Sequence, residues 1–134
     1  YVVGILDRLQ SEMACLQGMG IGIAAISAND ADDYPADSFE NMGLLAKREE
    51  FSFPYLYDET QVVAKAYNSV CTPDFFGFDA HDGLQYRGRL DDAGKSPKPS
   101  VSNRELYEAM KQVAETGRGP SIQTPSMGCS IKWK

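Results

Sequence analysis

"VCTPDFFGFD", residues 70–79, places a cysteine two positions before a proline that opens an apolar run. A residue before proline is pushed toward extended geometry, and an X-Pro bond that enters a strand is sometimes cis. This geometry exposes the backbone of Thr72 for pairing with a substrate chain beside Pro73, and it places Cys71 next to that chain. A second interpretation stays open, in which Cys71 is a small buried hydrophobic residue and Pro73 starts an edge strand.

The sequence on both sides of this stretch predicts an α/β fold. Strand-like runs at residues 74–79 and 84–90 are joined by a turn rich in Asp and Gly, which predicts a β-hairpin. Upstream, apolar residues at helical spacing predict a helix from Val2 to Gly18 or Gly20, and residues 21–27 are typical of a strand buried on both faces. Capping patterns predict three more helices, at Asp37 or Ser38, at Asp58 with Gln61, and at Ser102 with Glu105. This order indicates a central mixed sheet flanked by helices.

The composition is that of one globular domain with an acidic balance of charge. The chain has 134 residues, and 43% of them are apolar, which is enough for one core. The net charge of −6 disfavours nucleic acid and anionic membranes as partners. No run approaches the roughly 20 apolar residues of a membrane span. We therefore expect a single domain over residues 1–134 that ends in a tail over residues 119–134.

The cysteine pattern bears on compartment and cofactors. Cys15, Cys71 and Cys129 are widely spaced, and an odd number does not fit a disulfide-stapled secreted scaffold. A reducing cytoplasm is the expected location, although the start of the sequence leaves removal of an export signal open. One histidine and no paired-cysteine spacing are too few ligands for structural zinc. We expect no metal and no cofactor.

Three further patterns are accounted for by local structure. The glycines of "GMGIG", residues 18–22, precede a strand and do not match a dinucleotide-binding loop, so they predict a helix end. His81 lies in the hairpin turn, where a solvated residue is commoner than a catalytic base. Four aspartates lack the ligand spacing of a calcium loop and are expected in a solvated loop: Asp30, Asp32, Asp33 and Asp37.

Four segments carry a resemblance to a known family: "GIAAISANDADDYPADSFENM", "FPYLYDETQVVAKAYNSVCTPDFFGFD", "LQYRGRLDD" and "TPSMGCSIKWK". They resemble the thioredoxin-like proteins of the alkyl hydroperoxide reductase and thiol-specific antioxidant (peroxiredoxin-like) family, and the match spans nearly the whole chain. The resemblance implies a thioredoxin-like fold with a redox cysteine at the N-terminus of its first helix and a cis-proline that faces this cysteine. Pro73 matches the cis-proline, and Thr72 matches the residue before it.

One part of the family pattern is missing. In the resembling proteins, a central strand and a Cys-x-x-Cys-Pro segment lie directly before the residues that match Tyr1 and Val2. A helix N-terminus lowers a thiol pKa and stabilises the attacking thiolate, and Cys15, about four turns along the helix, cannot replace that position. Without the first strand, two strand edges would be left unpaired in the sheet. We therefore expect a fragment of a longer protein, or a unit that another chain completes.

The resemblance leads to one main hypothesis about function and two alternatives. The main hypothesis is a thiol–disulfide oxidoreductase or peroxide-linked antioxidant protein, with the catalytic cysteines upstream of Tyr1 and the substrate docked beside Thr72 and Pro73. Its partners are a protein or small-molecule disulfide, or a peroxide, and a thiol reductant that the sequence does not identify. Cys71 and Cys129 are auxiliary thiols on this hypothesis, and a tail thiol without function is an equally open interpretation of Cys129.

The first alternative is a redox-inactive thioredoxin-like module that binds a peptide or protein partner at the cis-proline edge. The second is a subunit of a homo-oligomer whose missing strand comes from a partner chain.

Overall fold

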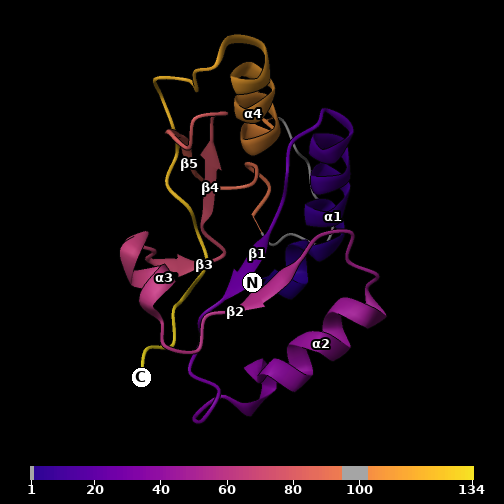
Figure 1. Cartoon of the computed structure of the whole chain (residues 1–134), viewed down its shortest axis with the longest axis vertical. Coiled ribbons are helices and arrows are strands. Elements are labelled where there is room, and N and C mark those ends of the chain that lie inside the picture. Colours follow the sequence, from indigo (N-terminus) through magenta and orange to yellow (C-terminus); the bar gives the residue numbers. More distant parts are fainter. Residues whose placement is uncertain (1, 95–102) are drawn as a thin grey trace. The chain divides into compact units, whose positions relative to one another are not determined.

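The computed structural model describes residues 2–94 and 103–134, and its contacts divide the chain into two units. The first unit consists of Tyr1–Gly22 and Cys71–Cys129, and the second of Ile23–Val70 and Ser130–Lys134. Both contain helices and short strands (Figure 1), so the α/β class predicted from the sequence is confirmed. Within the described residues the strands pair as three separate two-stranded sheets, which differs from the one central mixed sheet predicted from the sequence.

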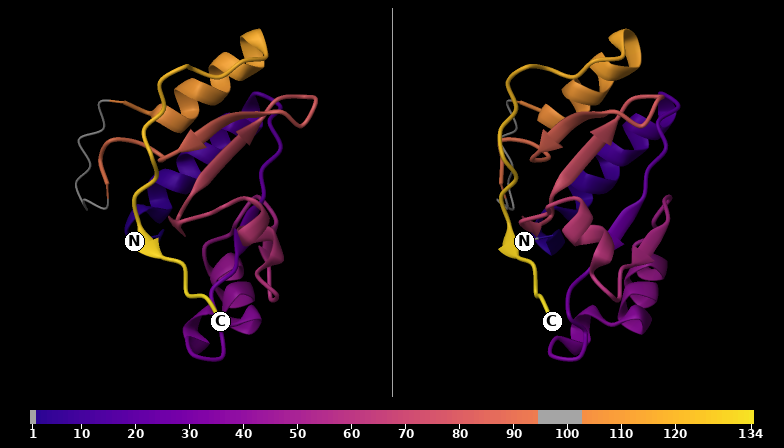
Figure 2. Two further views of the ribbon diagram at one scale, coloured as in Figure 1. Left: turned by 90° about the vertical axis from the view of Figure 1, so that its left-hand side faces the viewer. Right: turned by 60° about the vertical axis from the view of Figure 1, so that its left-hand side comes forward.

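Two helices and a hairpin build the first unit: α1 (Val2–Gly18), β4 (Phe75–Phe78), β5 (Leu84–Gly88) and α4 (Glu105–Thr116). Both helices are amphipathic, and α4 packs against α1 and against both strands of the hairpin. Figure 2 shows α4 lying along the hairpin. The buried apolar residues of the two helices form much of the core of this unit: Ile5, Leu6, Met13, Leu16, Leu106, Ala109, Met110 and Val113.

The hairpin confirms the pair of strands predicted for residues 74–79 and 84–90. It is antiparallel, and Gly77 lies opposite Tyr86. A β-carbon on Gly77 would overlap the sulfur of Met110, so the glycine allows α4 to approach the strand closely. Packing of the helix on the hairpin therefore depends on the small residue between the phenylalanines of β4.

The two ends of α4 differ in how far they follow the sequence pattern. Ser102, one half of the predicted capping box, lies outside the described residues, and Arg104 occupies the N-cap position without a side-chain cap hydrogen bond. At the other end, Gly117 has a φ of 78°, which glycine adopts without steric cost, and its N–H donates to the Val113 carbonyl at 2.7 Å. The helix therefore ends at a glycine that satisfies its last turn.

Short strands and helices alternate in the second unit: β1 (Ala25–Ser27), η1 (Pro35–Asp37), α2 (Phe39–Arg48), β2 (Tyr55–Tyr57) and α3 (Val62–Ala66). β1 and β2 pair in parallel, as the helix between them requires. Ser38 caps α2, as one of the two predicted caps, because its hydroxyl accepts the Asn41 N–H at 3.1 Å. α2 packs on β2, where the rings of Phe39 and Tyr57 lie 6.1 Å apart.

The prediction of a strand buried on both faces at residues 21–27 is wrong. β1 is only three residues long, and Ile26 is 46% exposed. Its register partner Leu56 is 50% exposed. Adjacent side chains on parallel strands lie on one face, so this face of the β1–β2 sheet is open to solvent while α2 packs on β2. Periodicity alone does not show whether the neighbours of an apolar run cover it.

The described residues include no helix that combines the length and the apolar character needed to cross a bilayer.

Candidate functional site

The segment that the sequence singled out forms a short strand followed by a proline turn in the first unit. β3 (Cys71–Thr72) precedes a cis peptide bond between Thr72 and Pro73, and β4 begins two residues later. β3 pairs with β6 (Cys129–Ser130). The structure therefore brings three of the sequence-predicted residues, Cys71, Thr72 and Pro73, next to the strand that carries the fourth, Cys129.

The segment before β6 lies directly on the backbone of β3. A β-carbon on Gly128 would overlap the Thr72 carbonyl oxygen and lie 3.1 Å from the Pro73 nitrogen. Any other residue at position 128 would need the two segments to separate. One side of the Thr72 backbone is thus already covered by the chain itself.

Cys71 is a half-buried thiol whose surroundings disfavour its thiolate form. Its S–H donates to the Pro73 carbonyl, with 3.4 Å between sulfur and oxygen. Burial raises the pKa of Cys71, the negative charge of Asp74 raises it further, and Arg87 opposes both effects. Because the thiolate is the reactive form, these surroundings keep Cys71 less nucleophilic than an ordinary cysteine at neutral pH.

Asp74 is anchored by two side chains from elsewhere in the unit. Its carboxylate accepts a hydrogen bond from the Ser126 hydroxyl at 2.7 Å and pairs with Arg87 at 3.4 Å. The guanidinium of Arg87 lies 5.0 Å from the centre of the Phe76 ring. These contacts hold the residue after Pro73 in place, and through Ser126 they connect the proline turn to the segment that precedes β6.

A small cavity separates Pro73 from the N-terminal half of α1. Its walls include Ile5 and Arg8 of α1, Pro73, Phe75 and Met127. The volume of about 10 Å³ is close to the minimum for one water molecule. The cavity therefore places the proline turn against α1 but leaves no room there for a substrate.

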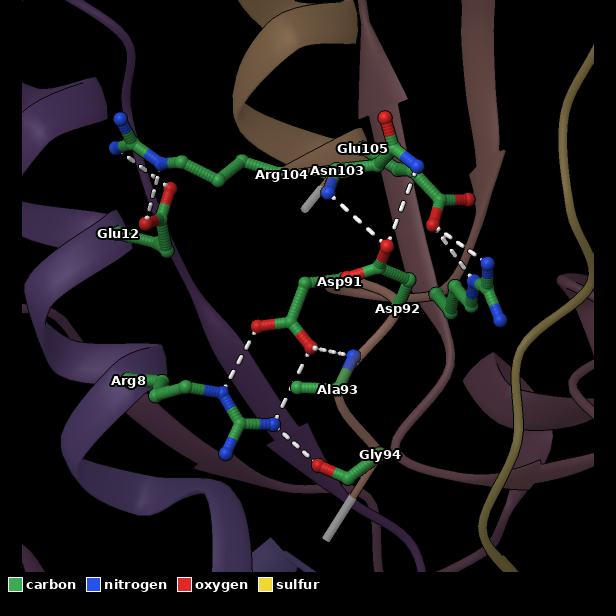
Figure 3. Close-up of polar contacts among 10 residues, drawn as sticks. Arg8, Glu12, Asp91, Asp92, Ala93, Gly94, Asn103, Arg104 and Glu105 are labelled. Atoms are coloured by element: carbon green, nitrogen blue, oxygen red, sulfur yellow. Dashed lines mark hydrogen bonds and ion pairs between the residues drawn. The ribbon is translucent and has the colours of Figure 1, made fainter. Parts of the chain in front are cut away.

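Arg8 holds α1 to the loop that follows the hairpin. Its guanidinium makes a two-pronged ion pair with Asp91, at 2.9 Å and 3.2 Å, and also donates to the Gly94 carbonyl (Figure 3). The two side chains are 15% and 5% exposed. Such a partly desolvated, bidentate pair has fixed geometry, so it positions the wall of the cavity beside Pro73.

A second arginine ties α1 to the start of α4, near the exposed Cys15. Arg104 pairs with Glu12 at 2.9 Å and 3.1 Å, as Figure 3 shows, and its guanidinium stacks 3.8 Å from the Tyr107 ring centre. A longer contact of 3.9 Å joins Arg104 to the sulfur of Cys15. Cys15 is thus part of a helix-to-helix contact, away from the Thr72–Pro73 turn.

A wider groove of the first unit lies away from the turn. It has a volume of about 450 Å³ and runs between α4 and residues 120–124, with Glu108, Gln112 and Glu115 on its helix side. None of the cysteines and neither residue of the Thr72–Pro73 turn lines it.

The remaining candidates lie in turns and loops, but the expectation of a solvated position is wrong for Asp30, which is buried at 6% exposure. The His81 N–H donates to the Asp79 carboxylate at 2.8 Å within an exposed turn. The glycine-rich run ends α1, and Gly20 has a φ of 84°. The carboxylate of Asp30 accepts the Asp32 N–H at 3.1 Å inside the acidic loop. Among residues 2–94 and 103–134, no cluster of His, Cys, Asp and Glu could hold a metal ion.

The roles of several residues in this region were not predicted from the sequence. Gly128, Ser126 and Arg87 take part through contacts that are distant along the chain: Ser126 and Asp74 are 52 positions apart. The one local feature that could have indicated this region is Arg8, a charged residue within an apolar helical pattern. Its partner Asp91 is buried.

Comparison with known proteins identifies relatives but no activity. No family profile matches the chain, and no curated protein matches it. A solved structure of a hypothetical protein from Sinorhizobium meliloti 1021 is 38% identical with a TM-score of 0.92, and the match covers 100% of this chain and 73% of that one. An uncharacterized conserved protein from Geobacillus kaustophilus is 44% identical with a TM-score of 0.91, covering 100% and 71%. The chain therefore belongs to the same family as these two uncharacterized proteins.

Proposed function

We propose that this chain is a thioredoxin-like domain of a thiol-dependent oxidoreductase, either a thiol–disulfide oxidoreductase or a peroxide-linked antioxidant protein. The observation that carries the proposal is the position of Pro73, which lines one cavity with Ile5 and Arg8 of α1. In the peroxiredoxin-like family that the sequence resembles, the matching proline faces the N-terminal part of the first helix, where the redox cysteine lies. The support is this geometry together with the sequence resemblance.

Thr72 and Pro73 are the proposed docking site for the backbone of a substrate. Because Gly128 covers one side of Thr72, a substrate pairs with the other side or displaces the segment around Gly128. Main-chain pairing of this kind accepts many side chains, which suits an enzyme that acts on disulfides in different proteins.

Cys71 and Cys129, the auxiliary thiols of the sequence-based hypothesis, are the thiols that this chain itself would supply for the exchange, since they lie on the paired strands β3 and β6. In thiol–disulfide exchange, a thiolate attacks one sulfur of a disulfide, forms a mixed disulfide and releases the other sulfur as a thiolate. Cys129 is exposed and makes this first attack in our proposal. Cys71, with its raised pKa, then attacks the Cys129 sulfur of the mixed disulfide, forms a Cys71–Cys129 disulfide and releases the substrate sulfur as a thiolate. This step is intramolecular and tolerates a smaller thiolate fraction. A dithiol reductant then reduces the Cys71–Cys129 disulfide by the same exchange.

A redox-inactive module that binds a peptide or protein partner at the same turn is the second candidate. The raised pKa of Cys71 favours it, because this thiol is not activated.

Reduction of insulin disulfides and of hydrogen peroxide by dithiothreitol, with and without the protein, tests the proposal. We expect turnover above the rate of dithiothreitol alone. Cys71→Ser or Cys129→Ser should lower this turnover about tenfold, which is 1.4 kcal/mol in the barrier. Cys15→Ser is the matched control and should leave it unchanged, because Cys15 contacts Arg104 instead of the turn.

Rates equal to those of dithiothreitol alone would reject the redox proposal. Binding of a reduced insulin chain by a variant in which all three cysteines are serine would then support the binding module.

A further inference from the structure

The end of the chain lies in a slot of the second unit formed by Asn29, Asp30 and Gln61. The Lys132 N–H donates to Oδ1 of Asn29 at 3.0 Å, and its carbonyl accepts from the Asp30 N–H at 2.7 Å and from Nε2 of Gln61 at 3.0 Å. The Lys134 N–H donates to Oε1 of Gln61 at 3.1 Å. Backbone groups two residues apart therefore face the slot, which is how extended peptides are bound by their main chain.

The side chains of the slot also make hydrogen bonds outside the tail. Gln61 is 1% exposed, and Nε2 of its side chain also donates to the Ala28 carbonyl at 2.7 Å. Nδ2 of Asn29 donates to the Asp37 carboxylate at 3.3 Å. Each amide thus has a second partner that fixes its orientation. Neither of these second partners belongs to the tail.

Side chains of the tail make contacts that select a sequence. Ile131 is 8% exposed and is the apolar anchor. The Lys65 ammonium lies 5.7 Å from the centre of the Trp133 ring, and the Lys132 ammonium lies 5.6 Å from that of Tyr34. Cation–π contacts of this length are favourable. The slot therefore fits an aliphatic residue, a lysine and an aromatic residue in succession.

We propose that Asn29, Asp30 and Gln61 form a binding site for an extended basic peptide with the pattern aliphatic–Lys–aromatic–Lys, and that Ser130–Lys134 is its tethered ligand. The residues of this site and the segment that it holds all belong to the second unit. A tether gives the tail a high effective concentration, so a free peptide competes poorly until the tail is released. A positively charged peptide is also attracted by a chain with a net charge of −6.

The test uses the full chain and a fluorescein-labelled peptide, Ser-Ile-Lys-Phe-Lys, with binding followed by anisotropy. Ile131→Asp removes the apolar anchor and releases the tail, so this variant should bind the peptide at least about tenfold more tightly than the unmodified protein. Ile122→Asp is the matched control, because Ile122 is 87% exposed, and it should bind like the unmodified protein. Circular dichroism verifies that each variant is folded.

Two further measurements keep the test decisive if Ile131→Asp does not fold. Trp133→Ala leaves Ile131 in place and should also increase binding, and Asn29→Ala in the same chain should reverse the gain about tenfold. Trp133 is the single tryptophan of the sequence, so excess unlabelled peptide, which lacks tryptophan, should shift the emission of the unmodified protein to the red as the tail leaves.

The proposal is overturned if a folded, tail-released variant does not bind the peptide, since the tail is then only a fixed part of the fold. It is also overturned if Asn29→Ala has no effect on binding. Equal binding of Ser-Lys-Ile-Lys-Phe, in which the side-chain pattern is shifted by one residue, would remove the proposed sequence preference.

Discussion

Arg8→Met tests how strongly the ion pair with Asp91 holds the first unit together. Methionine keeps the aliphatic stem of arginine and removes the guanidinium, which contacts both carboxylate oxygens of Asp91 and the Gly94 carbonyl. The Asp91 side chain is 5% exposed and, among the described residues, would keep only the Ala93 N–H, at 3.0 Å, as a donor. Breaking a buried pair by removing one partner costs about 3–5 kcal/mol, because the remaining charge is left uncompensated.

Urea titration followed by circular dichroism measures this loss in the free energy of unfolding. The matched control is Arg48→Met, since Arg48 pairs with Glu49 at 3.3 Å with 69% and 30% of the side chains exposed, and such pairs are worth about 0–1 kcal/mol. Adding Asp91→Asn to Arg8→Met should recover part of the loss, because the unpaired charge is then gone. A cost for Arg8→Met no larger than that for Arg48→Met would refute the reasoning, and so would the absence of any recovery.

Three smaller predictions concern single positions. Gly128→Ala should lower the free energy of unfolding by about 1–3 kcal/mol, because its β-carbon would overlap the Thr72 carbonyl oxygen. Gly43 lies within α2, and a β-carbon there would meet no atom within 4 Å, so Gly43→Ala should raise the free energy of unfolding by about 0.5–1 kcal/mol in the same urea titration. Cys71 should be alkylated by iodoacetamide at pH 8 more slowly than the exposed Cys15, because burial raises its pKa, and equal rates in peptide mass mapping would contradict this. Burial raises the pKa of Tyr86 to about 12, so the folded state holds this proton more tightly than the unfolded chain. The resulting contribution to the free energy of unfolding is complete below pH 10 and is lost between pH 10 and 12, by at most about 1.4 kcal/mol per pH unit. Tyr86→Phe should flatten that part of a pH series of urea titrations.

The parts of the fold that were predictable from the sequence are those controlled by local periodicity. The spacing of apolar residues in α1 and the turn between β4 and β5 need only a few neighbouring residues to be recognised, and both elements are present. The burial of β1 depends on which elements cover it, and these are distant along the chain. Ile26 and Leu56 are as apolar as buried strand residues, yet both face solvent.

The residues of the candidate site also fall into those that a local pattern indicates and those that depend on distant contacts. Cys71, Thr72 and Pro73 form a local pattern that was visible in the sequence. Gly128 could not be recognised, because its importance lies in a close approach to Thr72, and glycines are common in irregular segments whether or not another backbone lies close to them. The ion pair of Arg8 with Asp91 joins positions 83 apart, so the sequence offers two charged residues but no sign that they meet.

Gln61 shows how one residue can fit a local pattern and yet act at long range. Together with Asp58 it was interpreted as a capping pair for a short helix, and the Asp58 half of that prediction is correct, since its carboxylate accepts the Ala64 N–H at 2.8 Å. Gln61 itself has a φ of 65° and is 1% exposed, which is an unfavourable position for an amide that serves only as a cap. Its side chain instead joins the Ala28 carbonyl to the backbone of the tail, 71 and 73 positions away. A buried polar side chain in a strained backbone conformation is better explained by the chain segment that it binds than by the helix beside it.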